Sequence, residues 1–337
     1  MDATAFYDQE RYVHMPVTQS RDIEVIDGQL HDFGPRSAKP IANPEIQRQI
    51  MLEGMISSME AVGVHGALLH PKDDMLANLA IAEFPDRFAK VIQVEATEPN
   101  LEERLATVQA QAGTLGVRII AGTRSSGAPL DPRCEERIRL LRTGGYDRFF
   151  KATTELGLPV FLFAAGDLSL AEQILACFPE LILIIDHLGL RQPPADQRDV
   201  PPFRLLPHLL ALARFPNVAV KVCGALSLSA TGRPYEDVWP HVAEVISAYG
   251  IERLIWGSDI SRFQCRSSWD WAGRAAADYK FANDGRHTYA DALSYFRDTE
   301  RLTPGEKQLL LSGNLRRILG WRSTDTAPRA WWTAPNS

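Results

Sequence analysis

The stretch Leu181-Ile-Leu-Ile-Ile-Asp-His-Leu-Gly-Leu190 decides the fold class of this chain. It begins as an unbroken apolar run and ends in an acid, a histidine and a glycine. A short apolar run bounded by polar residues is typical of a strand buried on both faces, as in a parallel sheet. Asp186 and His187 stand where this strand leaves the sheet, and in barrels of alternating strands and helices that end carries the chemistry. We therefore predict a buried parallel strand with functional side chains at its carboxyl end.

Similar apolar runs recur along the chain and alternate with helical patterns. One helix is predicted to begin at Asn43 and to end near Gly63, and Asp167 is expected to cap the helix after the fifth strand. Eight strands that alternate with helices predict the α/β class and closure into a single (β/α)8 TIM barrel. An open doubly wound sheet would usually show a glycine-rich phosphate turn after an early strand, and the sequence has none. The predicted strands are 23–31, 64–70, 90–95, 116–121, 158–163, the quoted stretch, 217–223 and 253–259.

The length of 337 residues fits one such barrel with insertions. We predict an N-terminal arm at 1–22, the barrel at 23–321 and a C-terminal tail at 322–337. Either end could pack on the barrel or on a partner subunit, so a homodimer is compatible with the sequence.

Composition excludes several classes of protein. The formal charge of −6 argues against general nucleic-acid binding, which needs a basic face. No apolar run approaches the roughly 18 residues that cross a bilayer, and the N-terminus shows no basic segment followed by an apolar one. The four cysteines are scattered without a CxxC pair, which is typical of reduced thiols. We therefore expect a cytoplasmic protein that binds neither nucleic acid nor membrane.

Three polar residues mark the ends of strands one, six and eight: His31, His187 and Asp259. In a closed barrel these ends converge on one mouth. One such histidine alone could simply hold a loop, but three residues at equivalent positions favour a function. Two imidazoles and a carboxylate suit either a metal site or an acid–base site. A period of two on the first strand also predicts that Asp27, Gln29 and His31 point to the same side.

Five short motifs stand at or near the predicted strand ends and near the end of the barrel: Asp27-Gly-Gln-Leu-His31, Asp186-His-Leu-Gly189, Val220-Lys-Val-Cys-Gly224, Trp256-Gly-Ser-Asp259 and Gly313-Asn-Leu-Arg-Arg-Ile-Leu-Gly-Trp321. Together they resemble the amidohydrolase superfamily, in particular its amidohydrolase-related group, which includes sugar-acid lactonases, 2-pyrone-4,6-dicarboxylate lactonase and a decarboxylase. The resemblance covers roughly 23–321, and it implies a (β/α)8 barrel with a hydrolytic or decarboxylating site at its mouth.

The sequence departs from the metal-binding members at two positions. Those members carry His-x-His on the first strand and a histidine at the end of the fifth, where this chain has Gln29 and Phe163. A catalytic zinc normally has three protein ligands, and a neutral amide oxygen is a weak one. We therefore expect no tightly bound metal, as in the pyrone lactonase of that group. The alternative is one zinc or manganese ion held by His31, His187 and Asp259.

The resemblance and the residues together predict hydrolysis of a lactone or similar cyclic ester. Asp259 would take a proton from water, while His31 and His187 polarise the carbonyl. Without a metal the oxyanion needs cationic help, and several basic residues near the mouth suggest a small anionic substrate. Lys221 stands out because a lysine within an apolar strand needs an anionic partner or the pocket. The candidate substrate-binding residues are Gln29, Arg118, Arg124, Lys221, Arg191 and Arg262.

Four other functions stay open on the sequence. The first is a metal-dependent decarboxylase or hydrolase of the same family, and the second is a lactone isomerase that uses one histidine as a shuttle base. The third is a barrel that binds ligands without catalysis. The fourth, a cysteine hydrolase that uses Cys223 or Cys265, has little support because neither residue stands in a nucleophile motif. His70 ends the second strand and could also line the mouth.

Overall fold

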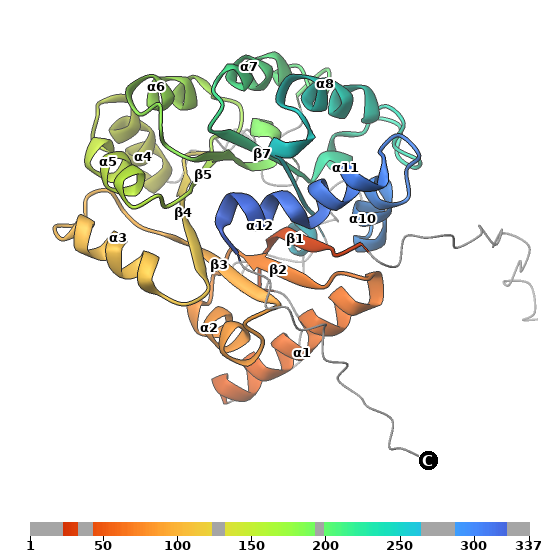
Figure 1. Ribbon diagram of the computed structural model, residues 1–337, viewed down its shortest axis with the longest axis horizontal. Coiled ribbons are helices and arrows are strands. Elements are labelled where there is room, and N and C mark those ends of the chain that lie inside the picture. Colours follow the sequence, from red (N-terminus) through yellow and green to blue (C-terminus); the bar gives the residue numbers. More distant parts are fainter. Residues whose placement is uncertain (1–22, 33–42, 123–131, 193–198, 264–286, 322–337) are drawn as a thin grey trace, which may run out of the picture.

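A computed structural model describes residues 23–32, 43–122, 132–192, 199–263 and 287–321 of the chain (Figure 1). The predicted arm at 1–22 and tail at 322–337 lie outside the described residues, and so does Arg124. The backbone of Arg262 is described, whereas its side chain is not.

Eight parallel strands form one sheet in which each strand pairs with its neighbour in sequence, in the order β1 to β8. The strands curve round until β8 meets β1, so the sheet forms a nearly closed barrel surrounded by helices (Figure 1). The predicted (β/α)8 TIM barrel is thus confirmed. The strands are β1 (Ile26–Leu30), β2 (Gly66–Leu69), β3 (Phe88–Gln93), β4 (Thr114–Ile120), β5 (Val160–Phe163), β6 (Leu183–Ile185), β7 (Val218–Cys223) and β8 (Leu254–Gly257).

Helices follow the strands and cover the outside of the barrel. The main ones are α1 (Pro44–Val62), α2 (Asp74–Glu83), α3 (Leu101–Ala110), α4 (Pro132–Arg142), α5 (Asp147–Glu155), α6 (Ser169–Cys177), α7 (Leu206–Ala211), α8 (Trp239–Tyr249), α9 (Ile260–Phe263), α10 (Tyr289–Arg297), α11 (Pro304–Gln308) and α12 (Asn314–Leu319). Short 3-10 turns lie at η2 (Asp186–Gly189), η3 (Leu212–Arg214), η4 (Ala225–Leu228) and η5 (Ile251–Arg253), and a π-helical turn, η8 (Leu309–Gly313), joins α11 to α12.

The helix ends test two predictions from local sequence. α1 begins as predicted, because the Asn43 side chain accepts a hydrogen bond from the Glu45 backbone nitrogen, and Gly63 ends it at a φ of 84°. The predicted Asp167 cap is wrong, because the N-cap of α6 is Leu168. The Asp167 carboxylate instead pairs with Arg142 at 2.8 Å.

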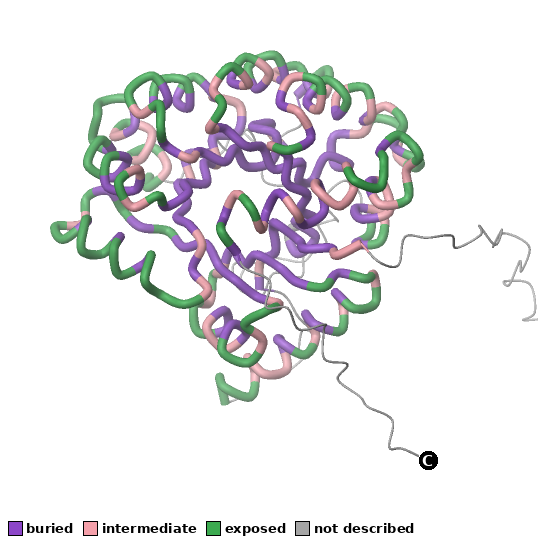
Figure 2. The backbone as a smooth tube through the Cα atoms, in the orientation of Figure 1, coloured by how far each residue is buried: buried purple, intermediate pink, exposed green. Residues whose placement is uncertain are grey.

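Buried side chains form one core between sheet and helices and a second inside the barrel, and Figure 2 shows the strands as a buried ring within more exposed helices. α12 closes the amino end, because the Asn314 side chain donates to the carbonyl oxygens of Ile251 and Leu254, at 2.7 and 2.8 Å. The carboxyl ends of the strands therefore form the mouth. The inner core consists of Ile26, Leu68, Ala89, Val91, Phe161, Ile184, Ala219, Ile255, Leu315, Leu319 and Trp321.

Two glycines allow β1 and β8 to approach closely at the seam of the barrel. The backbone nitrogen of Asp259 donates to the carbonyl oxygen of Gln29 at 3.0 Å. A Cβ atom at Gly28 would lie 2.6 Å from the carbonyl oxygen of Trp256, and one at Gly257 would lie 2.9 Å from the Gln29 Cβ. The seam thus depends on residues without side chains, and it sets the position of Asp259.

We expect Gly28→Ala to destabilise the barrel by about 1–3 kcal/mol, the usual cost of overpacking, because the new methyl meets a backbone oxygen that cannot move aside cheaply. The urea unfolding midpoint measures this loss. Gly305→Ala is the matched control, since a Cβ there has nothing within 4 Å. Equal midpoints for the two variants would contradict the close approach at the seam.

One prediction about β1 is wrong. The register between β1 and β2 shifts after Asp27, and such an irregularity resets the alternation of side chains. Asp27 therefore does not share a side with Gln29 and His31. Its carboxylate accepts hydrogen bonds from the Ser258 backbone nitrogen and from the Tyr289 hydroxyl of α10, each at 2.8 Å. Gln29 and His31 remain together, with 3.1 Å between their Nε2 atoms.

Among the described residues, no helix combines the length and the apolar character that crossing a membrane would require.

Candidate active site

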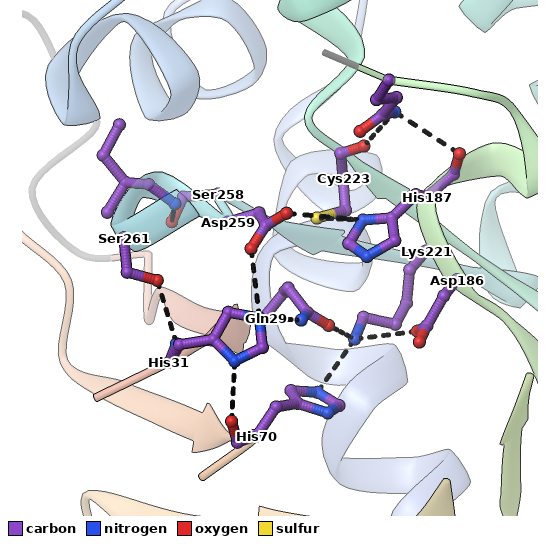
Figure 3. Close-up of polar contacts among 12 residues, drawn as sticks. Gln29, His31, His70, Asp186, His187, Lys221, Cys223, Ser258, Asp259 and Ser261 are labelled. Carbon is purple, nitrogen blue, oxygen red and sulfur yellow. Dashed lines mark hydrogen bonds and ion pairs between the residues drawn. The ribbon is translucent and has the colours of Figure 1, made fainter. Parts of the chain in front are cut away.

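The carboxyl ends of β1, β6 and β8 bring His31, His187 and Asp259 together at the mouth of the barrel (Figure 3). Asp259 lies between the two rings. Its Oδ1 is 3.4 Å from His31 Nε2, and its Oδ2 is 3.8 Å from His187 Nδ1. The carboxylate is fully buried, whereas 15% of the His31 side chain is exposed. Three residues that are far apart in sequence thus share one small space.

Two of these three residues adopt a left-handed backbone conformation. The φ angle is 53° at His187, 59° at Leu188 and 52° at Asp259. Residues other than glycine adopt this region at a cost of roughly 1–2 kcal/mol each, and such strain gathers at functional sites. The seam hydrogen bond to the Asp259 backbone nitrogen helps to hold one of these turns. The turns aim both side chains inward just beyond the ends of their strands.

Asp186 holds two cations beside this group. Its Oδ2 accepts a hydrogen bond from Arg118 Nε at 2.7 Å, and its Oδ1 lies 3.1 Å from Lys221 Nζ. Burial by itself would raise the pKa of Asp186, but the charges of Arg118 and Lys221 hold that pKa well below its usual value. Burial also lowers the pKa of Lys221, against the opposing charge of Asp186. Asp186 was expected to be functional at the end of its strand, but it was not among the predicted catalytic or substrate-binding residues.

A chain of hydrogen bonds runs from Lys221 through Gln29 to His31. Lys221 Nζ donates to Gln29 Oε1 and lies 3.0 Å from His70 Nε2. Because an ammonium group can only donate, it fixes the orientation of the Gln29 amide. The amide nitrogen of Gln29 then faces His31 Nε2 at 3.1 Å. Lys221 therefore lies within this group, and its ammonium group contacts Asp186, Gln29 and His70.

The partners of His31 also determine its tautomer. His31 Nδ1 lies 2.7 Å from the backbone carbonyl oxygen of His70, which can only accept, so Nδ1 carries the proton. Burial and then the charge of Arg118 lower the pKa of His31 to about 3, so the ring is neutral near pH 7. In that form Nε2 is an acceptor. In this tautomer Nε2 carries no hydrogen for a substrate carbonyl, and the predicted role of His31 stays a prediction.

His187 lies between a guanidinium group on one side and acceptors on the other. Its Nε2 is 3.5 Å from an Arg118 terminal nitrogen, which can only donate. Its Nδ1 then carries the proton in the neutral ring and faces Cys223 Sγ at 3.2 Å and the Asp259 carboxylate. The Phe163 ring packs edge-on against His187 with centroids 5.2 Å apart. Arg118 thus lies next to both His187 and the Asp186 carboxylate.

We expect the neutral buried histidines to make the protein sensitive to acid. Burial lowers the pKa of His31 to about 3 and that of His287 to about 4, and it lowers the pKa of His70 well below 6.5. The unfolded chain therefore binds protons first, and stability falls as the pH drops below about 6.5 toward 4. Each such histidine contributes a slope of up to roughly 1.4 kcal/mol per pH unit.

Urea unfolding at a series of pH values measures that slope. His31→Asn should reduce it by about one proton, whereas His208→Asn, a change on the surface, should leave it as it is. A stability that stays constant between pH 6.5 and pH 4.5 would contradict the neutral state of these rings.

The other predicted substrate-binding residues contact other partners or lie outside the described residues. Arg191 lies 3.6 Å from Asp199, which Arg204 also contacts at 3.2 Å. Arg124 and the side chain of Arg262 lie outside the described residues. His70, which was expected to be able to line the mouth, and Cys223 at the end of β7 both lie in this group.

A divalent metal held in the manner of His-x-His sites does not fit the groups around His31. Gln29 directs its amide nitrogen to His31 and its oxygen to Lys221, and Phe163 stands at the end of β5. An amide N–H and an ammonium group would repel a cation at this place.

A different set of three side chains brings possible metal-ligand atoms close together. Atoms of His187, Cys223 and Asp259 lie within 4.8 Å of one another, and this is the group that the described residues form. The alternative ligand set predicted from sequence, with His31 in place of Cys223, stays a prediction.

Comparisons with known proteins agree with this architecture. A family model described as amidohydrolase matches residues 54–321. A 4-sulfomuconolactone hydrolase from Rhizobium radiobacter is 29% identical over 240 residues, which are 69% of this chain and 74% of that protein. A protein of the same name from Hydrogenophaga intermedia is 28% identical over 244 residues, 69% of this chain and 73% of its own length.

Solved structures share the fold. A probable 2-pyrone-4,6-dicarboxylic acid hydrolase from Acinetobacter baumannii, with citric acid bound, has a TM-score of 0.58 at 21% identity over 89% of this chain and 100% of its own. An amidohydrolase from Burkholderia multivorans with bound zinc has a TM-score of 0.61 at 18% identity, over 88% of this chain and 99% of its own. Because the family model matches well over half of the chain, this protein is an enzyme of the amidohydrolase family.

Proposed function

We propose that this enzyme hydrolyses the ring ester of a small anionic lactone, with a water molecule activated by Asp259 and without a required metal ion. The observation that carries the proposal is the fully buried Asp259 carboxylate at the mouth of the barrel, 3.4 Å from neutral His31 and 3.8 Å from His187. The names of the 4-sulfomuconolactone hydrolases and of the 2-pyrone-4,6-dicarboxylic acid hydrolase support the substrate class, since each specifies a cyclic ester that carries acidic groups.

A water molecule beside Asp259 would donate one hydrogen to its carboxylate, which leaves an oxygen lone pair for the substrate. His31 Nε2 already accepts from the Gln29 amide, so the carboxylate is the base assigned to this water. Asp259 takes the proton as the oxygen attacks the lactone carbonyl. General base catalysis of this kind contributes about 10²–10⁴ in rate.

Arg118 is the group best placed to stabilise the oxyanion. Its guanidinium is almost fully buried, and Asp186 fixes it at 2.7 Å. A charged donor that is held in place and screened from water stabilises developing negative charge strongly. His187 would orient Asp259 through Nδ1–H. When the intermediate collapses, the ring C–O bond breaks, and the proton on Asp259 passes to the leaving oxygen.

The balance of charge supports a mechanism that needs no metal. Asp186 and Asp259 provide two negative charges, and Arg118 and Lys221 provide two positive ones within contact distance of the site. The cationic help that a metal would give is instead assigned to Arg118.

The experiment is a screen of anionic lactones in the presence of a chelator, followed by turnover in ¹⁸O-labelled water. We expect one labelled oxygen in the new carboxylate and no loss of rate with the chelator. An unlabelled product would indicate an isomerase, and release of carbon dioxide a decarboxylase. Either outcome, or complete loss of activity with the chelator and recovery with zinc, would overturn the proposal.

A further inference from the structure

We propose that His187, Cys223 and Asp259 form a binding site for one thiophilic divalent ion such as Zn²⁺, and that the bound ion inhibits the enzyme by occupying Asp259. Only the inhibition rests on the proposed hydrolysis. The ion-binding step stands on the geometry of the three side chains and has its own test.

The distances suit a small tetrahedral ion. His187 Nδ1 lies 3.2 Å from Cys223 Sγ and 3.8 Å from the Asp259 carboxylate, and all three ligand atoms lie within 4.8 Å (Figure 3). Zinc bonds of about 2.0–2.3 Å at tetrahedral angles place neighbouring ligand atoms about 3.3–3.6 Å apart. Small side-chain adjustments therefore bring the three atoms to one ion, with the fourth position left to water.

The ligand types also select this class of ion. A thiolate, an imidazole nitrogen and a carboxylate oxygen are the three zinc ligands most common in proteins. Burial and then the charge of Asp259 raise the pKa of the Cys223 thiol well above its usual value, so the thiol is protonated without an ion. Binding releases that proton to solvent, and the resulting thiolate and the Asp259 carboxylate together neutralise the dication.

The buried Gln192 side chain links the backbones of two of the three ligand residues. The Gln192 amide nitrogen donates to the backbone carbonyl oxygen of Cys223 at 2.9 Å and to that of His187 at 3.4 Å. It therefore ties the turn after β6 to the end of β7.

Occupation of the site would disturb catalysis at two points. Asp259 can no longer accept a proton from water while it is a ligand. In addition, a metal on Nδ1 moves the ring proton of His187 to Nε2, which faces Arg118 at 3.5 Å. Because the guanidinium cannot accept that hydrogen, the contact between Arg118 and His187 must lengthen. The ion is therefore an inhibitor, and it shares no ligand with a His-x-His pair on β1.

The test is titration of the full-length protein, stripped of metal, with Co²⁺, which shows a sulfur-to-cobalt charge-transfer band when a thiolate binds it. We expect the band to saturate at one equivalent and to disappear when Zn²⁺ displaces the cobalt. Cys223→Ser should lose the band. Cys177→Ser and Cys134→Ser, which change an exposed and a half-buried thiol, should keep it.

Two further measurements guard against variants that fail to fold. X-ray absorption of zinc-loaded wild-type protein should show one sulfur at about 2.3 Å, without any substitution. For inhibition, each protein is compared with its own rate without added metal, and Zn²⁺ should slow wild type but not Cys223→Ser. Absence of the band, its persistence in Cys223→Ser, or activation by Zn²⁺ would overturn the inference. If no lactone is turned over, the proposed function fails, while the cobalt result still decides the site.

Discussion

Asp259→Asn should lower the turnover of the lactone by at least about 10²–10⁴, because the amide cannot take a proton from water. The substitution suits this position for a second reason. Asp259 has a φ of 52°, and asparagine tolerates the left-handed region better than other side chains without charge. The variant should therefore keep the turn and the seam, and lose only the carboxylate. Steady-state kinetics measure the fall in kcat, and thermal unfolding checks the fold.

A control variant separates the loss of a base from the loss of any carboxylate. Asp298→Asn removes a half-exposed acid that contacts only its neighbour Arg297 among the described residues. Its kcat should match that of the wild type. If Asp259→Asn also kept a rate within a factor of about three, the assignment of Asp259 as the base would be wrong.

Asp186→Asn should destabilise the fold by about 3–5 kcal/mol, the usual result of removing one partner from a buried charge pair. Asp186 is fully buried and contacts both Arg118 and Lys221, so its loss leaves two buried cations without their anion. Denaturant unfolding at pH 7 measures the difference.

The sign of its pH dependence follows from the direction of the pKa shift. The pKa of Asp186 is lowered in the folded protein by Arg118 and Lys221 against the effect of burial, so its contribution is complete above the unfolded pKa of about 4 and declines as the pH falls below it. The difference between wild type and Asp186→Asn should therefore be largest near neutral pH.

Asp167→Asn is the matched control for this prediction. Asp167 pairs with Arg142 on the surface, where such pairs contribute about 0–1 kcal/mol. A loss in Asp186→Asn no larger than that in Asp167→Asn would show that Asp186 does not hold the two cations. Activity is a second readout, because Arg118 should lose the orientation that the proposed mechanism requires.

The fold could be predicted from the sequence because it follows from local patterns of apolar and polar residues. Each strand of the barrel is a short apolar run, and the alternation with helices fixes both the parallel sheet and the number of strands. The polar residues that follow those runs were found for the same reason, since parallel strands place all their carboxyl ends at one mouth. His31, His187 and Asp259 therefore came from sequence position alone.

Details that depend on contacts between distant elements were missed or wrong. Strict alternation predicted that Asp27 and Gln29 point to the same side, but the pairing of β1 with β2 shifts in register after Asp27. Aspartate is a common N-cap residue, but α6 begins at Ser169, so its N-cap is Leu168 and not Asp167. Local propensity is only one of the terms that decide such positions, and packing outweighs it.

What the sequence by itself determined was the barrel, its mouth and the residue types gathered there, because these follow from periodicities of a few residues. Only the tertiary structure decided how those residues are charged and which way they point. The His70 carbonyl and the Lys221 ammonium group fix the hydrogens of His31 and Gln29, and these partners lie 39 and 192 residues away in the chain. Donor and acceptor roles are set by such neighbours in space, so no local pattern can reveal them.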